Sequence, residues 1–343
     1  MVLKLNQETI MGMVRGFQPA CVIIAAAELD LFTLLQRRPM SAASLAKRTN
    51  GDLRALVILL DVLTAMGFLK RSGDRDPIYS VPTAAAAVLA EGGSGCMLGM
   101  VRHLGNCLRR WSELAHVVQC GKPARRRASI RGASEDLTAF IRAMHEISAP
   151  MADPLVGTLG KVNFTHLLDL GGASGTWTIA FLKRNPSARA TIMDQPDVIP
   201  LAKQRMRRAG LSKRVQFCAG DFMRGALPRG ADLAWVSAIV HQNSRTQNRR
   251  LFAKVFKALV PGGRIMIRDI VMNPSRTSPE AGAFFAVNML VNTPGGGTFT
   301  FAELADDLAS AGFTHIRLLR RGQAMDSIVS AGKAVAPPRN AGS

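Results

Sequence analysis

Short apolar runs alternate with amphipathic stretches through the second half of the chain. The apolar runs span residues 165–170, 188–193, 214–218, 232–237 and 264–272. Continuous apolar runs of this length are typical of strands buried on both faces, as in a parallel sheet. An amphipathic stretch over 245–259 fits a helix between the last two strands. The alternation predicts an α/β fold with a mainly parallel sheet.

The chain continues with two more helical patterns and two short strands. Apolar residues at helical spacing predict helices over 278–291 and 300–311, and residues 314–319 and 326–330 have the composition of strands. Residues 334–343 contain two prolines and no core residues, so we expect this tail to be disordered.

The first half is mostly helical in pattern. Helices are predicted over 18–36, 41–48 and 53–66, followed by two short strands within 68–81. Ser41 or Ser44 is the expected cap of the second helix, and Asp52 is the expected cap of the third. Three helices and a hairpin are typical of a winged helix.

A winged helix can serve two purposes. It can grip DNA, and its candidate phosphate contacts are Arg48, Arg54, Lys70 and Arg71. The helix over 53–66 argues against this use, because it is apolar almost all round, whereas a recognition helix needs polar side chains for base edges. The pattern therefore favours self-association, with nucleic-acid binding as the alternative.

A basic loop separates two helical regions in the middle of the chain. Residues 92–118 are helical in period, residues 121–132 are basic and poor in apolar side chains, and helices over 134–160 follow. We expect a first domain over 1–110 and a second over 111–333, with the helices of 134–160 linking them.

A glycine-rich turn follows the first strand of the second domain. Asp169 starts it, and Gly171, Gly172 and Gly175 let the backbone turn sharply and approach a ligand. The next strand ends at Asp194, 19 residues beyond Gly175. A carboxylate in that position accepts hydrogen bonds from ribose hydroxyls in doubly wound folds.

The ordered motifs resemble those of class I S-adenosylmethionine-dependent methyltransferases. They comprise Asp-x-Gly-Gly-x-x-Gly at 169–175, Asp194, Gly220-Asp-Phe222, Val240-His241, Pro261-Gly-Gly263, Asp269, Asn288-Met-Leu290 and Gly295-Gly-Gly297. Over residues 15–332 the chain is similar to the small-molecule O-methyltransferases of the plant caffeate and bacterial polyketide type. The resemblance implies a Rossmann-like seven-stranded sheet with an antiparallel edge hairpin, an N-terminal winged-helix dimerisation domain, and a homodimer.

The resemblance also implies a cofactor site for S-adenosylmethionine, whose product is S-adenosylhomocysteine. The residues expected there are Asp169, Gly171, Gly172, Gly175, Asp194, Gln195, Asp221, Phe222 and Ser237. Asp194 would meet the ribose, Asp221 and Phe222 the adenine, and Asp169 the ammonium group.

His241 is the candidate general base, and Asp269 is the acid expected to orient it. In the family the base is usually followed by Asp-Trp, but Gln242-Asn243 stand here, and Thr298 falls where a second orienting acid is usual. The apparatus is therefore either the pair of His241 with Asp269 or proximity alone. His241 could instead be a structural residue at a helix start, and Asp269 could pair with Arg268.

The acceptor is expected to be an apolar or aromatic small molecule with a hydroxyl group. Its pocket residues would be Met144, His145, Asn288 and Met289, and the whole chain holds one tyrosine and three tryptophans, which argues against a sugar site. The alternatives are methylation of carbon or nitrogen, non-methylating chemistry on the same fold, and a DNA-binding regulator with a cofactor-sensing domain.

The composition bears on the compartment and the surface of the protein. The chain has 343 residues, 48% of them hydrophobic, and a net charge of +20 that is spread over both halves. The five cysteines are scattered, which predicts reduced thiols. The histidines are dispersed, which predicts no metal site. No apolar run is expected to be long enough to span a membrane. These features predict a cytoplasmic protein with a solvated basic surface.

Overall fold

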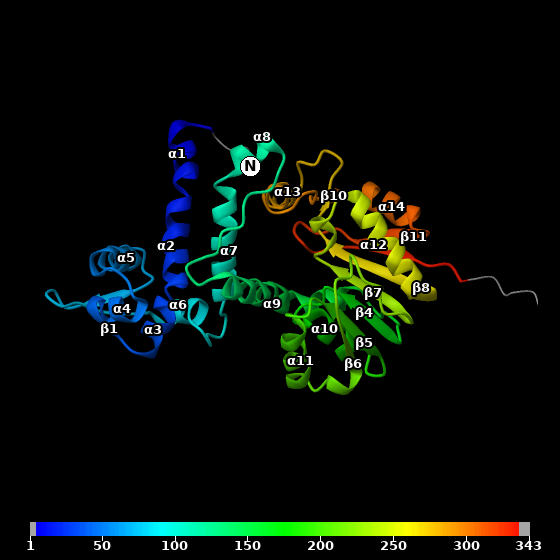
Figure 1. Cartoon of the computed structure of the whole chain (residues 1–343), viewed down its shortest axis with the longest axis horizontal. Coiled ribbons are helices and arrows are strands. Elements are labelled where there is room, and N and C mark those ends of the chain that lie inside the picture. The colour runs from blue at the N-terminus through cyan, green and yellow to red at the C-terminus, as the bar shows by residue number, and fades with distance from the viewer. Residues whose placement is uncertain (1–4, 336–343) are drawn as a thin grey trace, which may run out of the picture. The chain divides into compact units, whose positions relative to one another are not determined.

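The computed structural model describes residues 5–335 and contains two packing units (Figure 1). The first unit holds the residues up to Arg109 together with Arg126–Glu146, and the second holds Arg110–Arg125 together with the residues from Ile147 onward. The predicted boundary at 110 and 111 stays a prediction, because these units are not continuous in the chain. The tail predicted to be disordered lies, from residue 336, outside the described residues.

Helices and one small antiparallel sheet build the first unit. Its elements include α1 (Gln7–Arg15), α2 (Phe17–Glu28), α3 (Leu31–Arg37), β1 (Met40–Ser41), α4 (Ala42–Thr49), α5 (Leu53–Ala65), β2 (Lys70–Ser72), β3 (Ile78–Ser80), α6 (Thr83–Leu89) and most of α7 (Leu98–Trp111). The strand order is β1-β3-β2. Phe32, Leu45, Leu60 and Tyr79 are fully buried in its core.

Side-chain caps explain where α4 and α5 begin. The Ser41 side chain accepts from the Ser44 N–H at 3.3 Å, and the Asp52 carboxylate accepts from the Ala55 N–H at 2.8 Å. The cap of α4 is therefore Ser41 and not Ser44. The single helix predicted over 18–36 is wrong, because Asp30 adopts a left-handed φ of 59° that separates α2 from α3.

A seven-stranded sheet forms the centre of the second unit. Its strands are β4 (His166–Leu170), β5 (Arg189–Asp194), β6 (Val215–Ala219), β7 (Ala231–Ser237), β8 (Leu259–Asp269), β11 (Thr314–Arg320) and β12 (Ser327–Gly332). The order is β11-β12-β8-β7-β4-β5-β6, with parallel pairing from β8 to β6 and antiparallel pairing at β12 and β11. The predicted parallel sheet with an antiparallel edge hairpin is confirmed.

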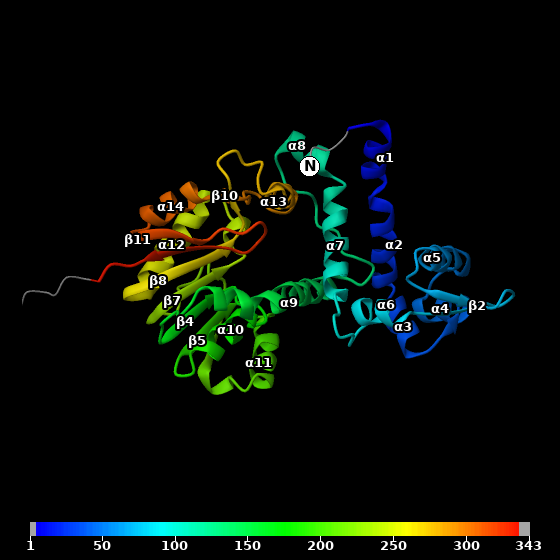
Figure 2. The ribbon, with the colours of Figure 1, turned by 180° about the vertical axis from the view of Figure 1, so that it is seen from behind.

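Helices cover both faces of this sheet (Figure 2). They are α9 (Ala133–Thr158, which spans both units), α10 (Thr176–Arg184) and α11 (Ile199–Arg208) on one face, and α12 (Arg245–Ala258) and α14 (Phe301–Ser310) on the other. The second unit also contains α8 (Leu114–Cys120) and α13 (Glu280–Asn292). Leu167 packs with α9, α10 and α11, while its neighbour Leu168 packs with α12 and α14. Alternate residues of β4 thus face opposite layers, as the pleat of a strand requires.

Two predicted elements are divided in the structure. The helical stretch predicted over 92–118 contains α7 and α8, with Ser112 and Glu113 between them. The strand predicted over 264–272 begins earlier, at Leu259, and is interrupted at Ile270. The remaining piece is β9 (Val271–Met272), which pairs with β10 (Phe299–Thr300) outside the main sheet.

The N-terminal helices differ from the prediction in one further respect. The helical stretch Gln7–Glu28 is long and apolar enough, by length and composition, to cross a membrane, although core helices and signal sequences pass the same test. The expectation that no such run exists is therefore wrong. Only 11% of its most apolar window is buried within the chain, so this surface is open to a partner.

Candidate active site

The carboxyl ends of the parallel strands bring the predicted cofactor residues to one edge of the sheet. Asp169 lies near the end of β4, Asp194 ends β5, and Ser237 ends β7. The glycine turn follows β4 directly and leads into α10. This is the edge at which open α/β sheets bind their ligands.

The glycine turn is shaped by its own packing. Gly171 and Gly175 have φ values of 65° and 74°, which only glycine adopts readily. A Cβ at Gly171 would lie 2.6 Å from the Ile239 side chain, and one at Gly175 would lie 2.4 Å from Met206. These glycines were expected to let a ligand approach, but the positive φ already favours glycine there, and the Ile239 and Met206 side chains would have to shift to admit a Cβ.

Asp194 holds the turn against the end of β5. Its two carboxylate oxygens accept from the backbone N–H groups of Ala173 and Gln195, both at 2.7 Å. Burial raises the pKa of Asp194, and the two backbone hydrogen bonds oppose this shift. Each carboxylate oxygen has a second lone pair, so Asp194 can still accept from a ligand.

Asp169 is buried with one oxygen unsatisfied. Its Oδ2 accepts from the Thr178 hydroxyl at 2.6 Å, but its Oδ1 has no hydrogen-bond partner among residues 5–335. Burial raises the pKa of Asp169 to about 7, with the charge of Asp194 adding to the shift and the Thr178 hydrogen bond opposing it. When Asp169 is ionised, its Oδ1 can accept a hydrogen bond from a ligand or from water.

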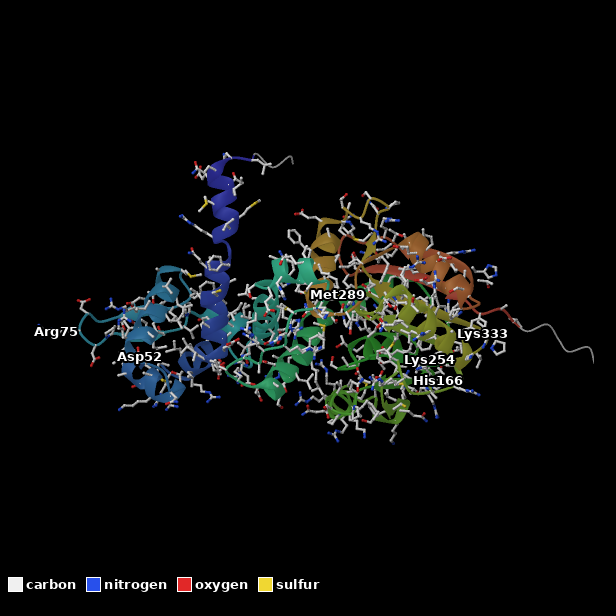
Figure 3. All side chains as sticks on the ribbon, turned by 45° about the horizontal axis from the view of Figure 1, so that its top comes forward. Asp52, Arg75, His166, Lys254, Met289 and Lys333 are labelled. Atoms are coloured by element: carbon white, nitrogen blue, oxygen red, sulfur yellow. The ribbon has the colours of Figure 1, made fainter. Side chains whose placement is uncertain are left out.

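The residues expected at the adenine lie beyond β6. The Asp221 carboxylate accepts from the Met223 N–H at 2.8 Å, and Lys254 of α12 donates to the Phe222 backbone carbonyl (Figure 3 labels Lys254). The Phe222 ring lies 3.6 Å from the position of a Cβ on Gly171. Phe222 is therefore next to the glycine turn. Gln195 is exposed.

His241 and Asp269 meet on the other face of the sheet edge. The His241 ring Nδ1 lies 2.9 Å from both carboxylate oxygens of Asp269, and both side chains are buried. Because a carboxylate only accepts hydrogen bonds, Nδ1 carries a proton in this contact, and in the neutral imidazole Nε2 presents its lone pair. Asp269 makes no ion pair with Arg268, whose side chain leaves β8 on the opposite face.

The backbone around His241 is held by the glycine loop of residues 295–297 and by hydrogen bonds from two asparagine side chains. The Gly297 N–H donates to the His241 carbonyl at 2.9 Å, and a Cβ at Gly296 would lie 2.5 Å from that oxygen. Asn243 donates to Asn248 at 3.0 Å, and Asn248 donates to the Val240 carbonyl at 2.9 Å. These contacts fix the segment that carries Gln242-Asn243 in place of Asp-Trp.

Helix α13 supplies the nearest aromatic and amide groups. The Phe285 ring meets the His241 ring edge to face, with centroids 4.8 Å apart. Asn288 lies one turn further along and Met289 is buried beside it (Figure 3 labels Met289). Met144 and His145 belong to the first unit, so their part in an acceptor pocket stays a prediction.

Trp111 and Asn292 were not expected at this edge, and Arg268 was expected only as an alternative partner of Asp269. Trp111 donates its indole N–H to the Asn288 side-chain oxygen at 3.0 Å, and Asn292 donates to the same oxygen at 3.1 Å. Arg268 is 2% exposed within β8. The only signal in the sequence was an arginine inside an apolar strand.

These residues fit S-adenosylmethionine. Asp194 offers lone pairs for ribose hydroxyls, the orphaned Oδ1 of Asp169 offers an acceptor for an ammonium group, and Phe222 offers an aromatic face beside the turn. Within residues 5–335, no group of three or more His, Cys, Asp or Glu side chains could hold a metal ion. These two acceptors and the aromatic face suit an organic ligand with hydroxyl and ammonium groups.

Comparison with known proteins agrees with this geometry. A model of the O-methyltransferase domain matches residues 111–314, and a model of the O-methyltransferase dimerisation domain matches residues 11–92. The chain is 31% identical to the tetracenomycin polyketide synthesis 8-O-methyl transferase of Streptomyces glaucescens, over 90% of this chain and 91% of that protein. It is 28% identical to a 3-hydroxy-5-methyl-1-naphthoate 3-O-methyltransferase of Streptomyces sahachiroi, over 89% of each chain.

The fold is also similar to that of a solved enzyme. The crystal structure of human N-acetylserotonin methyltransferase in complex with S-adenosylmethionine matches with a TM-score of 0.77 and 23% identity, over 98% of this chain and 100% of that one. The two matched domains cover most of the chain. The chain therefore belongs to the O-methyltransferase family.

Proposed function

We propose that this enzyme methylates a hydroxyl group of a flat, apolar aromatic molecule, with His241 as the general base. The observation that carries the proposal is the buried contact between His241 Nδ1 and both oxygens of Asp269, at 2.9 Å. S-adenosylmethionine, when bound, supplies an electrophilic methyl group and its own leaving group. The protein has to place the acceptor oxygen in line and remove its proton.

Asp269 supports this role in two ways. It selects the tautomer in which Nε2 of His241 can accept a proton, and it stabilises the imidazolium that forms. The carboxylate itself is fixed by the Ile270 backbone N–H, which donates to Oδ1 at 2.8 Å. Asp269 is therefore a positioning residue, while His241 touches the acceptor.

The groups on α13 support an aromatic acceptor. The edge-to-face contact of Phe285 with His241 places an aromatic wall beside the proposed base. A planar phenol can stack or pack on such a wall, whereas a sugar needs many polar groups. One relative named above is a methyltransferase of polyketide synthesis, and another is a naphthoate O-methyltransferase. Both support an aromatic acceptor.

Asn288 gives the acceptor site polarity. Arg110 donates to the Asn292 oxygen, Asn292 donates to the Asn288 oxygen, and Trp111 donates to it as well. Because arginine and indole nitrogens are only donors, both amide orientations are settled. The Asn288 NH₂ group has no partner among residues 5–335, so we expect it to donate to an oxygen on the acceptor.

A decisive experiment starts with an acceptor found by screening hydroxylated aromatics against the enzyme and S-adenosylmethionine. His241→Ala should then lower kcat by about 100-fold or more, the lower end of general base catalysis, and leave S-adenosylhomocysteine affinity nearly unchanged. Near-full turnover by the variant would leave proximity as the only source of rate. A product methylated on carbon or nitrogen would favour the alternative of C- or N-methylation over O-methylation.

The proposal includes a homodimer in the cytoplasm. The dimerisation domain match and the exposed apolar side chains of α1 and α2 support self-association, with Met13 58% exposed and Val14 62% exposed. Exposed apolar side chains grouped on neighbouring helices favour a protein partner. The five free cysteines support a reducing compartment.

A further inference from the structure

Arg268 is a buried cation near the carboxyl end of β8. Its Nη1 donates to Ser237 Oγ at 3.1 Å, its Nη2 lies 3.1 Å from Met151 Sδ, and its guanidinium carbon lies 4.5 Å from the centre of the Trp177 ring. Its Nε has no hydrogen-bond partner among residues 5–335. The side chain is therefore enclosed by one hydroxyl, one thioether and one aromatic face.

No carboxylate of the described residues pairs with this guanidinium. The two acids whose charges act on Arg268 already have partners, since Asp269 contacts His241 and Asp326 pairs with Arg320 at 3.0 Å. Burial lowers the pKa of Arg268 to about 10, so the group stays charged at neutral pH. A buried charge without a counter-charge is strongly unfavourable, and an anionic ligand would remove that cost.

Arg268 lies beside the proposed cofactor site. Ser237, its hydrogen-bond partner, stands next to it in register on β7. Trp177 belongs to the first turn of α10, which begins immediately after Gly175. The positive end of the α10 dipole points toward the same region and also favours an anion.

Asp169 provides the opposite charge on the same face of the sheet. Asp169 is in register with Trp235, and Ser237 and Arg268 follow two residues later along their strands, so all of these side chains share one face. β4 and β8 are separated by β7, which puts their backbones about 10 Å apart. Asp169 and Arg268 thus each have an unsatisfied buried atom, one an acceptor and the other a donor.

We propose that Arg268 binds the carboxylate of the methionine part of S-adenosylmethionine, whose ammonium group is already expected at Asp169 from the family resemblance. The zwitterionic end of the cofactor then bridges two buried charges that the protein leaves apart. This assignment rests on the proposed cofactor site at the glycine turn. It predicts that Arg268 contributes to the affinity for the amino-acid end of the ligand and little to the affinity for its nucleoside.

The test compares two ligands by calorimetry. S-adenosylhomocysteine has the carboxylate, and 5′-methylthioadenosine lacks the whole amino-acid end. Arg268→Met should weaken S-adenosylhomocysteine roughly 10- to 100-fold, the range for a hydrogen bond to a charged group, and leave 5′-methylthioadenosine within about threefold. Arg268→Lys should keep part of the affinity, because it retains the charge but not the fork of donors.

The controls separate this proposal from the cofactor site as a whole. Arg264→Met removes an arginine from the same strand and should change neither affinity. Failure of the wild-type protein to bind S-adenosylhomocysteine would refute the cofactor site itself. If the site holds, equal weakening of both ligands in Arg268→Met, or unchanged S-adenosylhomocysteine affinity, would overturn the role of Arg268.

A measurement on the wild-type protein covers the case in which Arg268→Met does not fold. The decarboxylated analogue of S-adenosylhomocysteine keeps the amine and loses only the carboxylate. It should bind wild type at least tenfold more weakly than S-adenosylhomocysteine and should bind Arg268→Lys with a smaller difference. Equal affinity of the two ligands for wild type would show that no cation reads the carboxylate.

Discussion

The His241 imidazole and the Asp269 carboxylate form a buried pair, with Nδ1 2.9 Å from each carboxylate oxygen. If Asp269 acts only through His241, its removal should matter only while His241 is present. Asp269→Asn alone should lower kcat about tenfold or more, whereas in a His241→Ala background it should change kcat less than about threefold. Single-turnover rates of the four proteins measure this coupling. Independent, multiplicative effects would contradict the proposed division of roles.

Asp194 is expected to bind the ribose and also to stabilise the turn. Asp194→Ala removes the acceptor of the Ala173 and Gln195 N–H groups as well as that of the ribose hydroxyls. S-adenosylhomocysteine affinity should fall by about 1.5–3 kcal/mol, and the melting temperature should fall too. Asp194→Asn retains an acceptor oxygen, so it should lose less of both. Unchanged affinity in a folded Asp194→Ala protein would refute the ribose contact.

Asp169 should make the stability of the ligand-free protein depend on pH. Its pKa is raised from 3.8 to about 7 by burial, so the folded protein holds a proton that the unfolded chain has lost. The stability from this proton is fully present below about pH 4 and is lost as pH rises through 7, with a slope of at most about 1.4 kcal/mol per pH unit.

Denaturant titrations at several pH values give the measurement for Asp169. Asp169→Asn should flatten the slope between pH 4 and 7, whereas Asp197→Asn at an exposed site should not. Saturating S-adenosylhomocysteine should also reduce the slope, because the ammonium group stabilises the carboxylate. An identical slope in Asp169→Asn would exclude this residue as its source.

Asp307 ties α14 to α12. Its fully buried side chain accepts from Arg249 Nε at 2.6 Å and from Arg245 Nη2 at 2.7 Å. Asp307→Ala should lower the free energy of unfolding by about 1.5–3 kcal/mol, as expected for hydrogen bonds to charged groups. Asp306 pairs with the same arginines but is 63% exposed, so Asp306→Ala should cost less than about 1 kcal/mol. Equal losses would show that burial is not the deciding factor.

The exposed face of α1 and α2 should carry the dimer. Val14→Asp and Phe17→Asp place charges on apolar positions that are exposed in the single chain. Light scattering should show a dimer for wild type and a shift toward monomer for the variants. A duplex-binding assay at two salt concentrations tests the alternative, because phosphate contacts weaken steeply with salt. A wild-type monomer that binds DNA specifically would overturn the homodimer.

Features that depend on a few neighbouring residues could be predicted from the sequence. Asp52 caps α5 because its carboxylate reaches an N–H three residues away, whatever the rest of the chain does. The strands that end at Leu170, Asp194 and Ser237 followed from runs of apolar residues long enough for a buried strand. The alternation of strands and helices then put Asp194 and the glycine turn at one edge of the sheet.

Features that depend on distant contacts could not be predicted in this way. The left-handed Asp30 that divides α2 from α3 leaves no mark in the helical period of 18–36. The contact of Trp111 with Asn288 joins residues far apart in the chain. Pairing at such separations depends on which elements pack side by side, and local propensity carries no information about that.

Arg268 shows the physical reason most directly. An arginine between apolar residues of a strand is compatible with an exposed end, an ion pair with Asp269, or burial without a partner. The pleat turns its side chain away from Asp269, and the packing of Met151 and Trp177 encloses it. Its charge therefore became a candidate for ligand binding only once the strands and helices were assembled, because burial and the absence of a counter-charge are properties of the packed fold.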